Sequence, residues 1–128
     1  DLHSFPTRRS SDLAAMCADI LAREMDFIGV GSNDLTQYTL AVDRTNKEVA
    51  ELFEPFHPAM LRIYRNLVQV ASSEGVPITV CGELASEPES ALVLIGLGFR
   101  SLSMTMSRIS AVRLAVQGKN IQELEKAF

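Results

Sequence analysis

The sequence predicts an α/β protein in which strands alternate with helices and pair in parallel. Two short apolar runs, at residues 27–30 and 78–80, suit buried strands, and the run at residues 101–104 suits a third short strand. Longer segments with apolar residues at helical spacing separate these runs. Strands that alternate with helical patterns of this length are typical of βα units, which build parallel sheets.

The helical pattern begins at Ala14 and continues to Leu21, and Asp26 ends it before the first strand. Residues 1–13 have neither helical nor strand periodicity. They resemble the translation of a sequencing-library adapter, and we interpret them as a non-native leader. The alternative is a disordered basic tail, which their composition also permits.

A polar corner follows the first strand. Residues 31–34 read Gly-Ser-Asn-Asp, which ends a strand, and Asn33 or Asp34 is expected to cap a helix that reaches about Val42. Loops at the carboxyl ends of parallel strands face the ligand in barrels of βα units. Asp34 can bind a hard cation, Asn33 can hydrogen-bond to phosphate or carboxylate, and Arg44 can hold an anion through two parallel bonds.

The rest of the chain repeats the alternation of helix and strand. Pro58 suits the first turn of a helix, and Gly75 is expected to end it. Gly96 and Gly98 end a second, strongly apolar helix. In order, the sequence predicts a short amphipathic turn at residues 49–53, a helix at 58–73, a strand at 78–80, a helix at 88–95, a strand at 101–104 and helices at 109–116 and 121–128.

Composition narrows the class of protein. The 128 residues are 47% hydrophobic and 22% charged, as in ordinary globular proteins, and the net charge of −4 lacks the basic footprint of nucleic-acid binding. No apolar run approaches the roughly 18 residues of a membrane helix, and no secretory signal is present. Cys17 and Cys81 form no metal-binding spacing; a disulfide between them stays open, but the composition fits a reducing cytoplasm better. We therefore expect a cytoplasmic protein with no nucleic-acid partner and no membrane insertion.

Each candidate residue also has a purely structural interpretation. Asp34 can serve only as a helix cap, and Arg44 can pair with the adjacent Asp43. Cys81 follows the second strand directly, where it is either a small buried core residue or a group facing an active site. Glu83 can hydrogen-bond nearby or serve only its own loop.

Two stretches carry a family resemblance. Residues 31–44, GSNDLTQYTLAVDR, and residues 80–85, VCGELA, resemble in order the two signatures of the phosphoenolpyruvate-utilising enzymes, and most closely those of the Enzyme I group of the bacterial sugar phosphotransferase system. The resemblance runs from about Ala14 to the C-terminus. It implies an α/β fold that is the C-terminal part of a (β/α)₈ barrel, because a closed barrel takes about 250 residues. Residues 14–128 would be a C-terminal fragment of the phosphoenolpyruvate-binding barrel domain.

The resemblance also implies residue roles. Asp34 would bind Mg²⁺ together with a glutamate on a preceding strand, which the leader replaces here. Asn33, Asp34 and Arg44 would contact phosphoenolpyruvate, and Cys81 would protonate C3 of the enolpyruvate to give pyruvate. Work of this kind needs a proton held within hydrogen-bond reach of the reacting atom.

The implied activity moves phosphate from phosphoenolpyruvate to an enzyme histidine and on to a histidine-phosphorylated carrier protein. That enzyme histidine belongs to a separate upstream domain, so His57 is expected to orient a loop, and this chain alone is expected to be inactive. The parent protein would be a homodimer. The alternatives are the nitrogen-regulatory paralogue, towards which residues 57–60 and 98–100 lean, a non-catalytic dimerisation fragment, and an unfolded truncation product.

Overall fold

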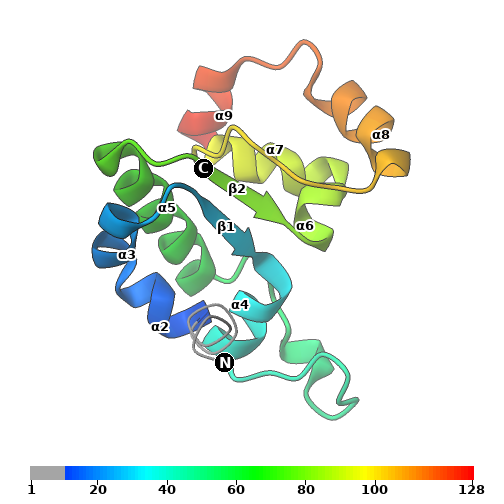
Figure 1. Cartoon of the computed structure of the whole chain (residues 1–128). Coiled ribbons are helices and arrows are strands. Elements are labelled where there is room, and N and C mark those ends of the chain that lie inside the picture. Colours follow the sequence, from blue (N-terminus) through cyan, green and yellow to red (C-terminus); the bar gives the residue numbers. More distant parts are fainter. Residues whose placement is uncertain (1–10) are drawn as a thin grey trace.

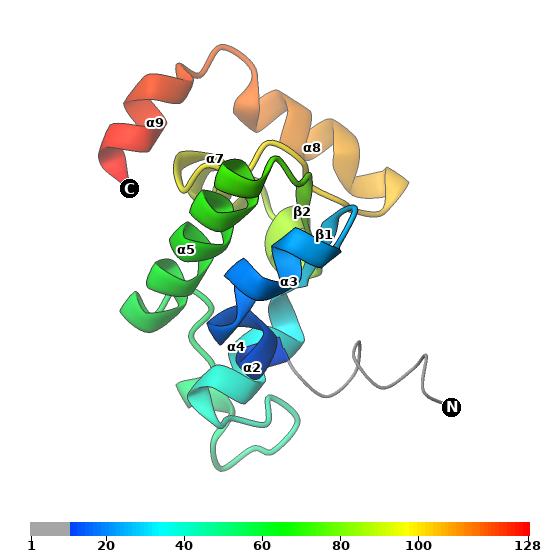
Figure 2. The ribbon, with the colours of Figure 1, turned by 60° about the vertical axis from the view of Figure 1, so that its left-hand side comes forward.

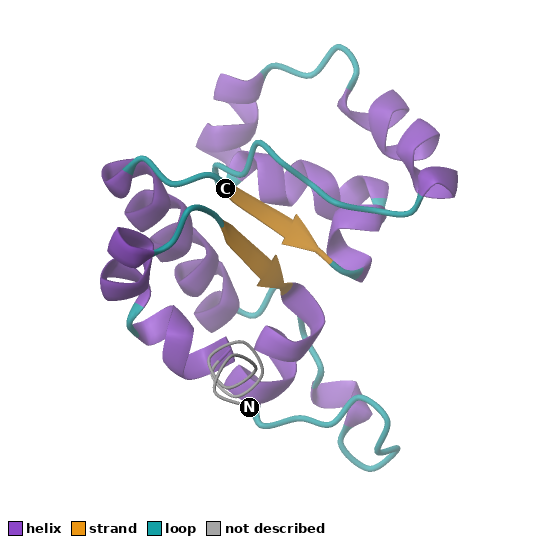
Figure 3. Ribbon diagram, in the orientation of Figure 1, coloured by secondary structure: helices purple, strands orange, loops and turns teal. Residues whose placement is uncertain are grey.

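Two short parallel strands, β1 (Ile28–Gly31) and β2 (Ile78–Cys81), lie at the centre of the computed structural model, which describes residues 11–128 (Figures 1 and 3). Their register pairs Ile28 with Ile78 and Gly31 with Cys81. The predicted parallel pairing is therefore confirmed. Both strands point the same way, so their carboxyl ends meet at one edge of the sheet.

Helices surround the strands. In the view of Figure 1, α2, α3 and α5 lie on one side of the strand pair and α7, α8 and α9 on the other, while Figure 2 shows α8 and α9 at one end of the molecule and α2 and α4 at the opposite end. The helices are α2 (Ser11–Met16), α3 (Ala18–Glu24), α4 (Ser32–Leu40), the 3₁₀ turn η1 (Ala50–Leu52), α5 (Pro58–Glu74), α6 (Glu83–Ser86), α7 (Pro88–Gly96), α8 (Met106–Val116) and α9 (Ile121–Ala127).

Helix α5 follows its prediction most closely. Pro58 occupies its first turn, and Gly75, at φ 68°, ends it in the left-handed conformation. His57 is the N-cap, because its Nδ1 accepts a hydrogen bond from the Ala59 amide at 3.1 Å. The imidazole therefore caps the start of α5, a role that was not predicted from the sequence, where His57 is expected to orient a loop. The apolar face of the helix is buried in the core through Met60, Tyr64, Leu67 and Ala71.

The core joins α5 to the second strand. Tyr64 and Phe99, both fully buried, pack edge to face with ring centroids 6.2 Å apart. Val80, at the centre of β2, is also fully buried. Because packed side chains on a strand fix its position, this core determines where β2 ends and where Cys81 emerges.

The third predicted strand, at residues 101–104, is reduced to one parallel bridge between Leu102 and Val80. The Val80 amide donates to the Ser101 carbonyl, and the Ser103 amide donates to the Val80 carbonyl. Within the described residues this bridge is the only strand pairing of the segment, so the predicted strand at residues 101–104 is confirmed only in part.

The N-terminal helix differs from its prediction in two ways. It begins at Ser11, so the last three residues of the predicted leader are helical, while residues 1–10 lie outside the described part. It also breaks at Cys17, where φ is −107° and ψ is 24°. The Cys17 amide is shared between the carbonyls of Leu13 and Ala14, a tightened turn that separates α2 from α3. Among residues 11–128, no helix combines the length and apolar character needed to cross a membrane.

Candidate functional site

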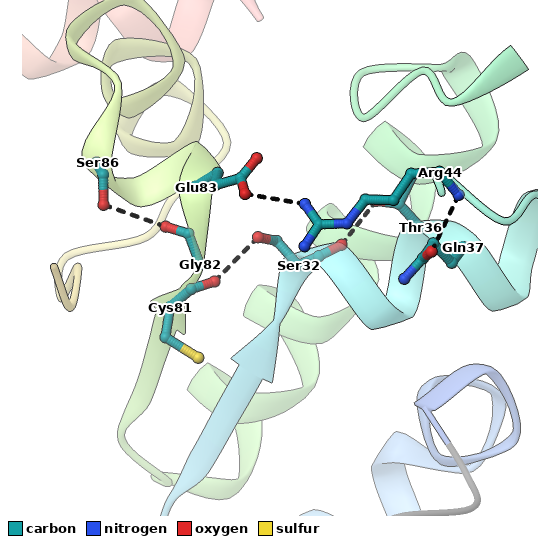
Figure 4. Close-up of polar contacts among 8 residues, drawn as sticks. All are labelled: Ser32, Thr36, Gln37, Arg44, Cys81, Gly82, Glu83 and Ser86. Carbon is teal, nitrogen blue, oxygen red and sulfur yellow. Dashed lines mark hydrogen bonds and ion pairs between the residues drawn. The ribbon is translucent and has the colours of Figure 1, made fainter. Parts of the chain in front are cut away.

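The two loops that carry the candidate residues meet at the carboxyl ends of β1 and β2 (Figure 4). Gly31 and Cys81, the last residues of the two strands, are register partners. The next residue along, Ser32, donates a hydrogen bond from its Oγ to the Cys81 carbonyl at 2.9 Å. Two stretches 49 residues apart in the sequence are therefore joined at one corner.

The start of α4 places Asn33 and Asp34 differently from the prediction. The helix begins at Ser32, directly after β1, and Gly31 is its N-cap without a side-chain cap. The expectation that Asn33 or Asp34 caps this helix is wrong, because both lie inside its first turn. A carboxylate there is favoured by the helix dipole. Asn33 is half-buried and Asp34 is exposed at the corner.

Helix α4 also ends earlier than predicted. Its last residue is Leu40, and Ala41 adopts the left-handed conformation at φ 53°, with its amide directed to the carbonyls of Gln37 and Tyr38. The chain then turns back, and the Arg44 amide donates to Gln37 Oε1 at 3.1 Å. This turn brings Arg44 alongside the helix and towards the second loop.

Arg44 pairs with Glu83 and not with the adjacent Asp43. Its Nη1 donates to Glu83 Oε1 at 2.9 Å, and Figure 4 shows the two side chains directed towards each other. Asp43 instead accepts hydrogen bonds from the hydroxyl and amide of Thr45, which lower the pKa of the Asp43 carboxyl. The Arg44 side chain is 37% exposed and that of Glu83 72%, so the ion pair lies open to solvent.

Cys81 is an exposed residue with a free thiol, so its interpretation as a buried core residue is wrong. Its Sγ donates to the Val30 carbonyl at 3.4 Å. Cys17 is also free, and no disulfide joins the two. A thiol that is accessible and weakly hydrogen-bonded can move to meet a substrate atom.

Gly82 allows the two loops to approach. Its backbone, at φ 103° and ψ −172°, lies in a region that only glycine adopts readily. A Cβ at Gly82 would stand 2.6 Å from Ser32 Oγ and 3.7 Å from Asn33 Cγ. The second loop therefore needs glycine here both for its conformation and for the space beside the first.

We expect Gly82→Ala to lower the free energy of unfolding by about 1–3 kcal/mol, the usual cost of such a backbone conformation in a residue with a Cβ. Urea denaturation followed by circular dichroism measures this. Gly118→Ala is the matched control, because Gly118 also has a positive φ, of 77°, but open space around its Cβ position. An equal loss in both variants would show that the close approach to Ser32 is unimportant.

Ser32 is the residue that the sequence did not single out. It is 1% exposed, and its own carbonyl accepts a hydrogen bond from Thr36 Oγ1 at 2.7 Å. A serine within a polar run looks like any surface loop residue, because its partner lies on a distant loop. The signal available was its place between a strand-ending glycine and Asn33.

The acidic and sulfur groups of the corner match only part of a metal site. Within residues 11–128 no three or more His, Cys, Asp or Glu side chains gather as a metal-binding group. Asp34 would thus supply a single carboxylate. Such a donor set fits Mg²⁺, which rests on one or two carboxylates, substrate phosphate and water, better than it fits an ion that needs a full protein cage.

Comparison with known proteins agrees with these features. Residues 12–121 match the family model described as PEP-utilising enzyme, PEP-binding domain. The chain is 41% identical over 113 residues to a phosphoenolpyruvate-protein phosphotransferase of Borreliella burgdorferi, covering 88% of this chain and 20% of that protein. It is 44% identical over 113 residues to a multiphosphoryl transfer protein of Xanthomonas campestris, covering 88% of this chain and 14% of that protein.

A third relative, named phosphoenolpyruvate-dependent phosphotransferase system, comes from Escherichia coli and is 43% identical over 105 residues, 82% of this chain and 14% of its own length. The chain thus spans about a fifth or less of these relatives. The family match covers most of the chain and includes both loops of the corner. The chain therefore belongs to the family of phosphoenolpyruvate-utilising enzymes and corresponds to part of their phosphoenolpyruvate-binding domain.

Proposed function

We propose that this chain is the C-terminal part of the phosphoenolpyruvate-binding domain of a phosphoenolpyruvate-protein phosphotransferase. The intact enzyme, the full-length protein containing residues 14–128, would pass phosphate from phosphoenolpyruvate to its own histidine and then to a phosphocarrier protein. The observation that carries the proposal is the contact between the two loops at the carboxyl ends of β1 and β2. There the loop of Ser32, Asn33 and Asp34 is bonded to the loop of Cys81, and Arg44 closes the gap through Glu83.

Arg44 and Asn33 would hold the anionic substrate. Arg44 forms an ion pair with Glu83 that is open to solvent, so exchanging this carboxylate for a substrate carboxylate or phosphate costs little. A guanidinium binds such groups through two parallel bonds. The Asn33 amide, in the first turn of α4, would add a neutral hydrogen bond next to the free amides at the start of that helix.

Asp34 would contribute one carboxylate to Mg²⁺. The ion would neutralise charge on the phosphoryl group, which passes through a transition state that is stabilised mainly by electrostatic placement. Asp34 is exposed at the edge where both strands end, so its carboxylate would be accessible to a metal ion.

Cys81 would donate the proton to C3 of the enolpyruvate as the phosphoryl group leaves, giving pyruvate. Its thiol already donates to the Val30 carbonyl, a long contact of 3.4 Å that the substrate carbon can replace. The proton passes from Sγ to C3, and the thiolate is reprotonated from water before the next turnover.

The partial barrel belongs to this proposal. Within the described residues, β1 pairs on one side only, and a cavity of about 550 Å³ lies between its other side and α2 and α3. Apolar residues line most of this cavity, including Leu21, Leu35 and Leu67. A neighbouring parallel strand of a (β/α)₈ barrel would pair with β1 there and fill the space. The same barrel would carry the homodimer contact of the intact enzyme.

Labelled phosphoenolpyruvate tests the proposal. We expect the intact enzyme to take up the label on histidine in the presence of Mg²⁺, and the purified 128-residue chain to take up none. Within the described residues no three His, Cys, Asp or Glu side chains gather to complete a metal site with Asp34, and His57 is engaged as a helix cap. Stable labelling of the purified chain, or an intact enzyme that stays unlabelled, would contradict the proposal.

A further inference from the structure

Ser32 is buried at the point where the two loops join. Of the residues in the core of the described chain, Ser32 and Thr36 are the polar ones, at 1% and 0% exposure. Burying a hydroxyl is unfavourable unless it is hydrogen-bonded, so a buried serine in a loop needs a specific partner. That partner is the Cys81 carbonyl, which accepts from Ser32 Oγ at 2.9 Å (Figure 4).

The Ser32 hydroxyl lies directly beyond the last paired residues of β1 and β2. Gly31 and Cys81 are the last register partners, and beyond them the chains diverge into α4 and the Gly82 turn. The hydrogen bond from the Ser32 hydroxyl to the Cys81 carbonyl thus joins the two segments one residue beyond the backbone pairing of β1 and β2. Thr36 Oγ1 donates to the Ser32 carbonyl at 2.7 Å, which holds Ser32 from the opposite side.

Close packing against Gly82 leaves the Ser32 hydroxyl little room to turn away from the Cys81 carbonyl. Gly82 lies so close that a Cβ there would stand 2.6 Å from Ser32 Oγ. The serine is thus confined between Thr36 and the Cys81–Gly82 peptide. The carbonyl of this peptide belongs to Cys81 itself. Fixing it therefore also fixes the direction in which the Cys81 side chain projects from the backbone.

We infer that Ser32 is a positioning residue for Cys81: its hydroxyl holds the Cys81 carbonyl and thereby orients the thiol. The inference rests on the proposed function, in which Cys81 is the proton donor. Without the hydroxyl, the Cys81 peptide is released from α4, and the thiol gains freedom to leave the Val30 carbonyl. The thiol then spends less time in the one direction that faces the substrate.

Site-resolved alkylation of the 128-residue chain measures this freedom. Iodoacetamide is added to the wild-type, Ser32→Ala and Ser32→Thr chains, and mass spectrometry follows the rates at Cys81 and Cys17 separately. We expect Ser32→Ala to raise the ratio of the Cys81 rate to the Cys17 rate by roughly 2- to 12-fold, the effect of losing one net hydrogen bond. Ser32→Thr keeps a hydroxyl at this position and is expected to restore the wild-type ratio.

Thr39→Val is the matched control. It removes a hydroxyl from the same helix, and Thr39 Oγ1 has no hydrogen-bond partner among the described residues. The ratio is expected to stay at the wild-type value. The inference is overturned if Ser32→Ala leaves the ratio unchanged or lowers it, if Ser32→Thr behaves like Ser32→Ala, or if Thr39→Val shifts the ratio equally. A chain that does not fold gives the same ratio in every variant and also overturns it.

The measurement is independent of turnover. Should Cys81 prove dispensable for turnover in the intact enzyme, its proposed role as proton donor fails while the alkylation result stands. Should alkylation be insensitive to Ser32 while Cys81 remains essential for turnover, the positioning role fails alone.

Discussion

The intact enzyme carrying Cys81→Ala is expected to lose about 10²- to 10⁴-fold in turnover of phosphoenolpyruvate, the usual contribution of a positioned general acid. Substrate binding should change much less, because in the proposed site Asn33, Asp34 with Mg²⁺, and Arg44 would meet the charges of the substrate. Cys81 is exposed and its thiol donates to a backbone carbonyl at 3.4 Å, so we expect its truncation to cost little stability.

Steady-state kinetics and a binding titration with phosphoenolpyruvate measure the two effects separately. Cys17→Ala is the matched control, because Cys17 is also an exposed free cysteine but lies between α2 and α3. Its turnover is expected to equal that of the wild type. Near-normal turnover in the Cys81 variant would remove the proton-donor assignment, since a residue with a purely structural role would leave the chemical step intact.

Arg44→Ala is expected to act on binding as well as on rate. Under the proposal it removes a charge-assisted contact that would be present in the bound ground state, worth roughly 10- to 100-fold in affinity. The apparent KM should therefore rise, in contrast to the Cys81 variant, and kcat/KM should fall at least as far. Titration of each variant with phosphoenolpyruvate in the presence of Mg²⁺ measures the difference.

Glu83→Gln is the control for the arginine. It breaks the ion pair but leaves the guanidinium in place, and an ion pair this exposed contributes at most about 1 kcal/mol. Affinity should therefore stay close to the wild-type value or improve, since Arg44 no longer has to leave a carboxylate. If Glu83→Gln weakened binding as much as Arg44→Ala, Arg44 would be acting through the second loop and not on the substrate.

Elements whose signals are local could be predicted from the sequence. Helix α5 carries its own start in Pro58, its apolar face at helical spacing and its end at Gly75, and the structure follows all of these. The two paired strands were recognisable because apolar β-formers precede polar turns. The third predicted strand is only a single bridge at Leu102 in the structure, because the length of a strand depends on pairing partners outside its own sequence.

In the candidate site, too, residue identities could be predicted from local sequence but contacts between distant residues could not. Asp34, Asn33 and Cys81 stand out by residue type and by their place after a strand, and Arg44 stands out by its place at the end of the first motif. Their contacts do not, because Arg44 meets Glu83 across 39 residues and Ser32 meets Cys81 across 49. The early start of α4 follows from β1 running directly into the helix, which no capping residue in the sequence announces.

The reason for glycine at position 82 also could not be predicted from the sequence. A glycine after a cysteine reads as a general loop signal, and only the structure reveals that Ser32 occupies the space a side chain would need. Close approach between distant loops is a property of the folded chain. Buried polar residues such as Ser32 are therefore the ones that sequence patterns miss most easily.

The most direct test of the account is the exchange of the C3 protons of pyruvate for deuterium by the intact enzyme, followed by proton NMR in D₂O. By microscopic reversibility, the group that protonates C3 also removes a proton from it. We predict exchange with the wild-type enzyme, loss of exchange with Cys81→Ala, and wild-type exchange with Cys17→Ala. Exchange at the wild-type rate in the Cys81 variant would contradict the account, because the corner would then lack the acid on which its chemistry depends.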